Sequence, residues 1–212
     1  MTATSDARPR GARLPRQARR RQLLGAAQEV FVSQGYHAAA MDEIAERAGI
    51  SKPVLYQHFP SKLDLYLALL DESVDAVIET VRSALSSTSD NKARVVATFG
   101  AYYDFVAGPG GAYRLVFESD LSNEPAVRER LDRSMRECAE MISEVIKEDT
   151  SIPDDAAHLL GVGLVGTAQV SARYWLDSDR TMAREDAVQL MARLAWRGIS
   201  GWPLAANQPS AD

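Results

Sequence analysis

Hydrophobic positions recur with a helical rather than a strand period along almost the whole chain of 212 residues. Apolar residues three and four positions apart line one face of a helix, so we predict an all-α protein of about nine helices. No stretch shows a convincing strand pattern. The expected helices cover residues 16–33, 41–48, 52–58, 61–85, 91–106, 113–119, 125–147, 154–176 and 181–200.

Residues 41–62 have the pattern of a helix-turn-helix. Gly49 follows the first of its two helices, where the chain needs a left-handed residue to leave. Ile50 then provides an apolar plug between the helices. Ser51 is expected to cap the second helix, and Pro53 falls in its first turn, where a missing N–H costs little. Two short helices joined by a tight glycine turn place the second helix in the major groove of DNA.

The charge distribution also favours a DNA-binding end. The whole chain is acidic, with a formal net charge of −5, but residues 1–62 hold ten Lys and Arg against five Asp and Glu. The remaining 150 residues hold fourteen against twenty-four. Such asymmetry is typical of a nucleic-acid-binding segment. We expect arginines at the start of the first helix to neutralise phosphates or to reach into the minor groove: Arg16, Arg19 and Arg20.

A long helix follows this small head. Ser61 is expected to cap it, with Asp64 completing a start similar to a capping box. Its apolar positions are Leu63, Leu67, Leu70, Val74, Val77, Ile78, Val81 and Leu85. The helix is too long for the head alone, so we expect it to link the head to the rest. The predicted division is a disordered basic leader (1–12), a helix-turn-helix DNA-binding domain (13–60), a ligand-binding and dimerisation domain (61–203) and a polar tail (204–212).

Other classes of protein are disfavoured by composition and motifs. The single cysteine, Cys138, excludes an intramolecular disulfide and suits a reducing cytoplasm. The three histidines (His37, His58 and His158) are too scattered for a metal site, and neither a Walker loop nor a G-x-S-x-G motif occurs, so we expect no metal, no cofactor and no enzymatic activity. No signal peptide is apparent, and the longest uncharged run, residues 159–172, is too short to cross a membrane. We expect a cytoplasmic protein.

Three motifs in the head identify a family resemblance. They are FVSQGY at 31–36, DEIAERAGIS at 42–51, and VLYQHF with the following SK up to residue 62. Together they resemble the DNA-binding domain of the TetR-type transcriptional regulators, over about residues 16–70 without a gap. The body is similar only in the number and length of its helices. One departure is Ala39-Ala40, where family members often carry a Thr or Ser that touches phosphate, and no such contact is assigned here.

This resemblance implies roles for individual residues. Tyr56 is similar to the family tyrosine that contacts the DNA backbone, and Lys62 to a phosphate-binding lysine. Residues 52–54 fall where base edges are contacted. The alternative for Tyr56 and Phe59 is a place in the core of the head. The expected DNA-binding residues are Arg16, Arg19, Arg20, Ser51, Lys52, Pro53, Val54, Tyr56, Gln57, His58 and Lys62.

Residues 35–59 also look like the FasR-like subgroup of this family, as do YRLVFE at 113–118 and ARYWLD at 172–177. The subgroup controls fatty-acid synthase genes and senses long-chain acyl-CoA. The resemblance therefore implies an acyl-CoA effector and control of lipid-synthesis genes. The alternative within the family is an efflux or catabolic operon released by a drug-like or steroid-like ligand. The alternative from another class is a helical lipid-binding carrier, which predicts no specific affinity for DNA.

We expect the apolar effector to bind between the helices of the body, where bundles commonly hold pockets. Aromatic stripes at helical spacing are also the pattern of plain core, so both interpretations stay open for each residue. The break GPGG at 108–111 is expected to form an entrance. The residues assigned to the ligand are Val77, Leu85, Phe99, Tyr102, Val106, Phe117, Ile142 and Leu164.

The segment GVGLVG at 161–166 fits the dinucleotide motif G-x-G-x-x-G but lacks the strand that must precede it. We interpret it as a helix with small residues on one side, namely Gly163, Gly166, Thr167, Val170 and Ser171. TetR-like proteins dimerise through their last two helices, and a palindromic operator requires two recognition helices about 34 Å apart. We therefore expect a homodimer, with internal packing as the alternative. A ligand in the body is expected to shift the long helix and so the spacing of the two heads.

Overall fold

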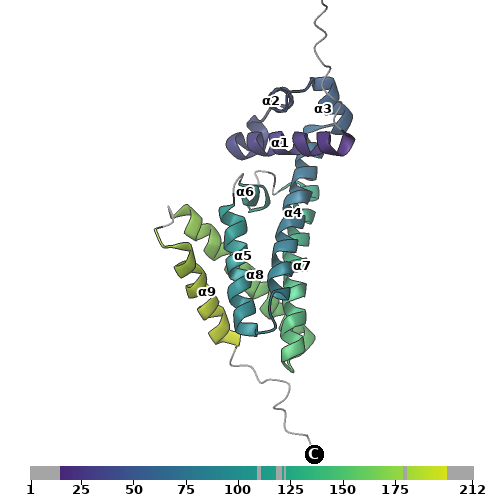
Figure 1. The fold of residues 1–212 in the computed structure, drawn as a ribbon. Coiled ribbons are helices and arrows are strands. Elements are labelled where there is room, and N and C mark those ends of the chain that lie inside the picture. The colour runs from purple at the N-terminus through teal and green to yellow at the C-terminus, as the bar shows by residue number, and fades with distance from the viewer. Residues whose placement is uncertain (1–14, 109–110, 118–120, 122, 179–180, 200–212) are drawn as a thin grey trace, which may run out of the picture.

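The computed structural model describes residues 15–108, 111–117, 121, 123–178 and 181–199 (Figure 1). Its regular elements form a small helical head and a longer helical body. The head contains α1 (Arg16–Ala38), α2 (Met41–Arg47) and α3 (Lys52–His58). The body contains α4 (Lys62–Ser86), α5 (Asn91–Ala107), α6 (Ala112–Phe117), α7 (Pro125–Asp149), α8 (Asp154–Asp177) and α9 (Arg184–Ile199). The predicted all-α architecture is confirmed, while the predicted leader (1–12) and tail (204–212) lie outside the described residues.

Two glycines and a serine determine helix boundaries in and beside the head. Gly35 has φ +76° and ψ 169°, so it divides α1 near its predicted end. Gly49 has φ +64°, the left-handed conformation predicted between α2 and α3. The Oγ atom of Ser61 accepts the backbone N–H of Asp64 at 3.0 Å. This bond confirms the predicted cap of α4.

Ser51 does not cap α3 as predicted. It precedes the helix in an extended conformation, but its hydroxyl forms no capping hydrogen bond. The turn between α2 and α3 is held from α1 instead, because Nε2 of Gln22 donates to the carbonyl of Ala48 at 2.8 Å. A contact 26 residues away in the sequence therefore stabilises the end of α2 that leads into α3.

The buried face of α4 near the head differs from the predicted one. Leu63 and Leu67 are only half-buried, whereas Leu65, Tyr66 and Leu69 are buried. Helix α4 packs against α1 and α6 as well as against α5 and α7, and its first turns lie beside α1 (Figure 1). One continuous helix therefore buries different sides along its length.

The last helix begins later than predicted, at Arg184 rather than near residue 181. The carbonyl of Met182 accepts a hydrogen bond from Nε1 of Trp175 at 2.8 Å, which holds this residue outside the helix. Arg184 then joins α9 to α5, since its Nη2 donates to the carbonyl of Gly100 at 2.8 Å. None of the helices in the described ranges has the length and apolar content needed to cross a membrane.

Candidate nucleic-acid interface and ligand cavity

Helix α3 directs most of its side chains outward. Within the helix only Leu55 is buried, and Val54 and His58 are half-buried. Tyr56 is 39% exposed, whereas Phe59, directly after the helix, is 2% exposed. The core alternative therefore holds for Phe59 and not for Tyr56. The other predicted contact residues at or near this helix are exposed: Ser51, Lys52, Pro53 and Gln57.

Basic side chains at the start of α1 lie beside the end of α3. Burial, followed by the charges of Arg16, Arg20 and Arg19, lowers the pKa of His58 below its ordinary value. The guanidinium of Arg20 also lies 4.5 Å from the ring centre of Phe59. The fold therefore brings the predicted arginines and the end of α3 together in one positively charged surface.

Lys52 has a carboxylate partner on α2. Its Nζ lies 2.7 Å from Oδ1 of Asp42, and both side chains are more than half exposed. The hydrogen bond from Lys52 to Asp42 raises the pKa of the lysine, so Lys52 is charged at neutral pH. An exposed pair of this kind contributes little to stability. The predicted contact of Lys52 with DNA therefore requires only that this weak pair with Asp42 breaks.

Lys62 forms internal contacts, whereas the family resemblance implies a phosphate contact. Its Nζ donates to the carbonyl oxygens of Tyr36, His37 and Ala39 at 2.8, 3.3 and 2.9 Å. The same atom lies 4.5 Å from the ring centre of Tyr36. Three acceptors match the three N–H groups of an ammonium, so a phosphate contact requires one of these bonds to break. In the free protein Lys62 joins the first turn of α4 to the end of α1.

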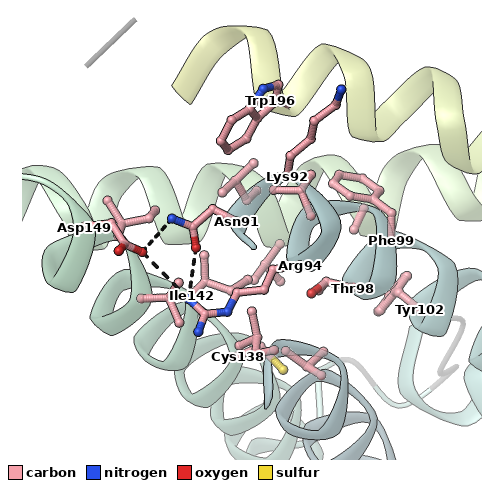
Figure 2. A pocket seen from close by; sticks show the side chains of 18 of the residues that line it. Asn91, Lys92, Arg94, Thr98, Phe99, Tyr102, Cys138, Ile142, Asp149 and Trp196 are labelled. Atoms are coloured by element: carbon pink, nitrogen blue, oxygen red, sulfur yellow. Dashed lines mark hydrogen bonds and ion pairs between the residues drawn. The ribbon is translucent and has the colours of Figure 1, made fainter. Parts of the chain in front are cut away.

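A cavity of about 500 Å³ lies between α4, α5, α7 and α8, with Trp196 of α9 at its edge (Figure 2). It is lined by six of the eight residues predicted for the ligand: Val77, Leu85, Phe99, Tyr102, Ile142 and Leu164. The side chain of the seventh, Phe117, lies outside the described part of the chain.

The eighth predicted residue, Val106, does not line this cavity. It lies one turn of α5 beyond Tyr102 and contributes instead to a second pocket between head and body. Gly108 and Gly111, which bound the predicted entrance, line that second pocket as well. Neither of these glycines lines the main cavity, and residues 109–110 between them lie outside the described part of the chain, so the entrance stays a prediction.

One end of the cavity is polar. Nδ2 of Asn91 donates to Oδ2 of Asp149 at 2.8 Å, and Nη1 of Arg94 donates to Oδ1 of Asn91 at 2.9 Å (Figure 2). The first of these bonds joins the first turn of α5 to the last turn of α7, and the second lies within α5. The cavity reaches the surface here, since three exposed residues also line it: Ser89, Asp90 and Lys92. The sequence pattern did not indicate this polar group, because polar residues at helix ends are typical of ordinary caps.

The rest of the lining is mainly apolar and chemically inert. Burial and the neighbouring Glu137 raise the pKa of the Cys138 thiol to about 11. Burial likewise raises the pKa of the Tyr102 hydroxyl. A protonated thiol is a poor nucleophile. Across the residues that the structure describes, no three His, Cys, Asp or Glu side chains are grouped to hold a metal ion. The walls of the cavity are therefore mainly apolar, with the Cys138 thiol in its protonated form.

Helices α8 and α9 each leave an apolar face uncovered. On α8, Leu159, Val170 and Tyr174 are more than 70% exposed, and a Cβ added at Gly163 or Gly166 meets no atom within 4 Å. On α9 the exposed residues are Leu190 and Leu194. The small-residue side predicted for α8 is therefore open at Gly163, Gly166 and Val170, whereas Ser171 is half-buried.

Residues 23–69 match the sequence profile of the family described as bacterial regulatory proteins, tetR family. The HTH-type transcriptional activator FasR of Mycolicibacterium smegmatis is 48% identical over 198 residues, which cover 93% of this chain and 90% of that protein. The similarity therefore includes the body as well as the head.

Solved structures share the fold. A TetR-like transcriptional regulator from Rhodococcus sp. RHA1 has a TM-score of 0.72 at 26% identity, covering 89% of this chain and all of that one. The regulator FadR of Bacillus subtilis, crystallised in complex with stearoyl-CoA, has a TM-score of 0.69 at 18% identity. That alignment covers 82% of this chain and 96% of the FadR chain. At this identity the likeness concerns the fold alone.

Proposed function

We propose that long-chain acyl-CoA controls the binding of this protein to a palindromic operator. The chain belongs to the TetR family of bacterial regulatory proteins and to its FasR-like subgroup. The chain is a DNA-binding transcriptional regulator and not an enzyme. The genes that we expect it to control are those of fatty-acid and lipid synthesis. A cytoplasmic location, where operator DNA and acyl-CoA are both present, is part of the same proposal.

The observation that carries the choice of effector is a cavity with apolar walls and one polar end at the surface. A long acyl chain fits the apolar part, and a large polar head group has a route to solvent past Lys92 and Arg94. The similarity to FasR, and the stearoyl-CoA bound to the FadR structure of the same fold, support this choice. A rigid drug-like or steroid-like molecule needs no charged head and makes less use of the polar end.

Dimerisation through α8 and α9 is the second part of the proposal. The exposed leucines and tyrosine of these helices form apolar stripes that water solvates poorly, and uncovered glycines allow a second helix to approach closely. Two copies packed through these faces form an isologous interface, which suits two half-sites of a palindrome.

Helix α4 is the proposed connection between effector and DNA. Its later turns form one wall of the cavity through Val77, Val81 and Leu85. Its first residue, Lys62, is bonded to the end of α1. An acyl chain that displaces the cavity end of α4 therefore also moves the head. Coupling of this kind is typically worth about 1–3 kcal/mol, or a change in DNA affinity of about 5- to 150-fold.

Fluorescence anisotropy tests the proposal with an operator selected from genomic fragments that the protein retains. We expect palmitoyl-CoA to change the operator Kd within the range above, and free CoA to leave it unchanged. The variant Ile142→Trp fills the cavity and is expected to bind DNA without responding to palmitoyl-CoA. An operator Kd that stays constant at saturating palmitoyl-CoA contradicts the acyl-CoA effector, and a response to a steroid alone supports the alternative ligand.

A further inference from the structure

Two hydroxyl groups in the cavity wall lack the hydrogen bond that other helical hydroxyls in this protein form. Ser73, Thr80 and Thr167 each donate to the carbonyl of the residue four positions earlier. Thr98 on α5 and Ser134 on α7 form no such bond among the described residues, and both line the cavity. Since Ser and Thr in helices usually bond back to the preceding turn, these two are available to a different acceptor.

The Oγ1 atom of Thr98 is buried and has no hydrogen-bond partner within the described structure. Leaving a buried hydroxyl unsatisfied is unfavourable, because the group has lost its hydrogen bonds to water. No bond holds the oxygen in its present rotamer, so rotation about χ1 suffices to present it to a ligand in the cavity. The side chain itself already contributes to the cavity wall (Figure 2).

The position of Thr98 along α5 separates the polar from the apolar part of the cavity. Arg94, at the polar end, is one turn earlier, and the buried Tyr102 is one turn later. At 1.5 Å per residue, Thr98 lies about 6 Å inward from Arg94. An acyl-CoA has one polar group at the boundary between its apolar chain and its polar head, which is the thioester carbonyl.

We infer that Thr98 donates a hydrogen bond to the thioester carbonyl oxygen of the bound acyl chain, and so selects acyl over alkyl ligands. The inference rests on the proposed acyl-CoA effector. It sets the direction of the ligand: the acyl chain extends from Thr98 toward Tyr102, and the head group leaves past Arg94. Ser134 lies 15 residues before Asp149 on α7, about 22 Å from the polar end along that helix, and therefore faces the chain rather than the carbonyl.

The test compares palmitoyl-CoA with its thioether analogue, in which a CH₂ group replaces the thioester C=O. Quenching of tryptophan fluorescence reports binding, because Trp196 lines the cavity. We expect the wild-type protein to prefer the thioester by about fivefold to tenfold, the contribution of one hydrogen bond. Thr98→Val is expected to remove this preference while leaving the affinity for the thioether unchanged. Thr98→Ser, which keeps the hydroxyl, is expected to retain it.

Two variants control for the substitution itself. Thr80→Val makes the same change on α4 at a residue that does not line the cavity, and Ser134→Ala removes the deeper hydroxyl. Both are expected to keep the preference for the thioester. Equal binding of the two ligands by the wild type, or a preference that survives Thr98→Val, overturns the inference. Loss of the preference in Ser134→Ala places the carbonyl at the deep end and also overturns it. Absence of binding by both ligands contradicts the acyl-CoA effector itself.

Discussion

Two lysines at the head differ in their bonding partners, and the partners determine what each side chain can contact. Lys52 and Lys62 are both lysines at the start of a helix, yet one has a single exposed carboxylate partner and the other has three backbone carbonyls. The three carbonyls lie beyond the break at Gly35, so hydrogen bonds rather than the dipole of the long part of α1 hold the ammonium of Lys62. Lys62 is consequently part of the scaffold that orients α3.

Replacing Lys62 with Met is expected to lower the free energy of unfolding by about 1–2 kcal/mol, as for hydrogen bonds to a charged group at a partly exposed site. Urea unfolding followed by circular dichroism measures the change. Lys92→Met is the matched control, because this exposed lysine does not bond to the end of a helix. Equal stability of the two variants would show that the carbonyl contacts of Lys62 contribute nothing.

His58 predicts a dependence of stability on pH. Its pKa in the folded protein is lower than the ordinary value, first because of burial and then because of nearby arginines. The unfolded chain therefore binds more protons than the folded protein as the pH falls through about 6.5, and the contribution of His58 to stability, present above that pH, is lost below it. We expect unfolding free energy to decrease more between pH 7.5 and 5.5 in the wild type than in His58→Gln. Identical decreases in the two proteins would refute a lowered pKa at His58.

At the scale of the element, α8 uses glycines on two sides for different purposes. A Cβ added at Gly161 lies 2.4 Å from the carbonyl oxygen of Ala139 on α7, a distance that packing does not allow. Gly163 and Gly166 have open space around them. Gly161 therefore permits the close approach of α7 and α8, which builds one side of the cavity, while the other two belong to the exposed face.

Gly161→Ala is expected to lower the free energy of unfolding by about 1–3 kcal/mol through overpacking. Gly163→Ala is expected to add up to about 1 kcal/mol to helix stability, but to weaken the proposed dimer by blocking close approach. Urea unfolding at two protein concentrations separates these effects. The loss of unfolding free energy in Gly161→Ala is expected to be the same at both concentrations. A loss in Gly163→Ala is expected only at the concentration where the wild type is dimeric. The same unfolding profile for both variants would argue against two separate glycine faces.

At the scale of the whole molecule, the proposed function uses two surfaces and one cavity, and one long helix joins the head to the cavity. Helix α4 contacts α1 at one end and encloses the cavity at the other (Figure 1). Helix α9 also takes part in two sites, because Trp196 lines the cavity while Leu190 and Leu194 are exposed. Ligand binding, dimerisation and head orientation are therefore expected to be thermodynamically linked.

Leu194→Glu is expected to raise the dimer dissociation constant by about tenfold to a hundredfold, the loss from one buried leucine side chain. Sedimentation velocity measures the dissociation constant, and anisotropy is expected to show a parallel loss of affinity for the palindromic operator. Met182→Glu is the matched control, because Met182 is exposed but lies before α9. A dimer that tolerates Leu194→Glu as well as Met182→Glu excludes this face of α9 from the interface.

Sequence patterns predicted the candidate sites unevenly, for reasons that particular residues make clear. The contact surface of α3 depends on residues within one short segment, and the family resemblance indicated an outward Tyr56, which the structure bears out. The set of residues that line the cavity depends on which apolar helix faces pack against one another, and this set was predicted only in part. Val106 and Tyr102 share one face of α5, but only Tyr102 lines the main cavity. The polar end went unrecognised because Asn91 and Asp149 are 58 residues apart in the chain.

The helical architecture, the helix-turn-helix and the basic character of the N-terminal part are all encoded locally along the chain. These properties follow from the local period of apolar residues, the left-handed glycine at position 49 and the distribution of charged residues. Three other features became visible only in the packed molecule: the acceptors of Lys62, the residues that line the cavity rather than the solid core, and the open faces of α8 and α9. Each of these depends on distances between residues far apart in sequence, and local spacing constrains such distances only after the helices have packed.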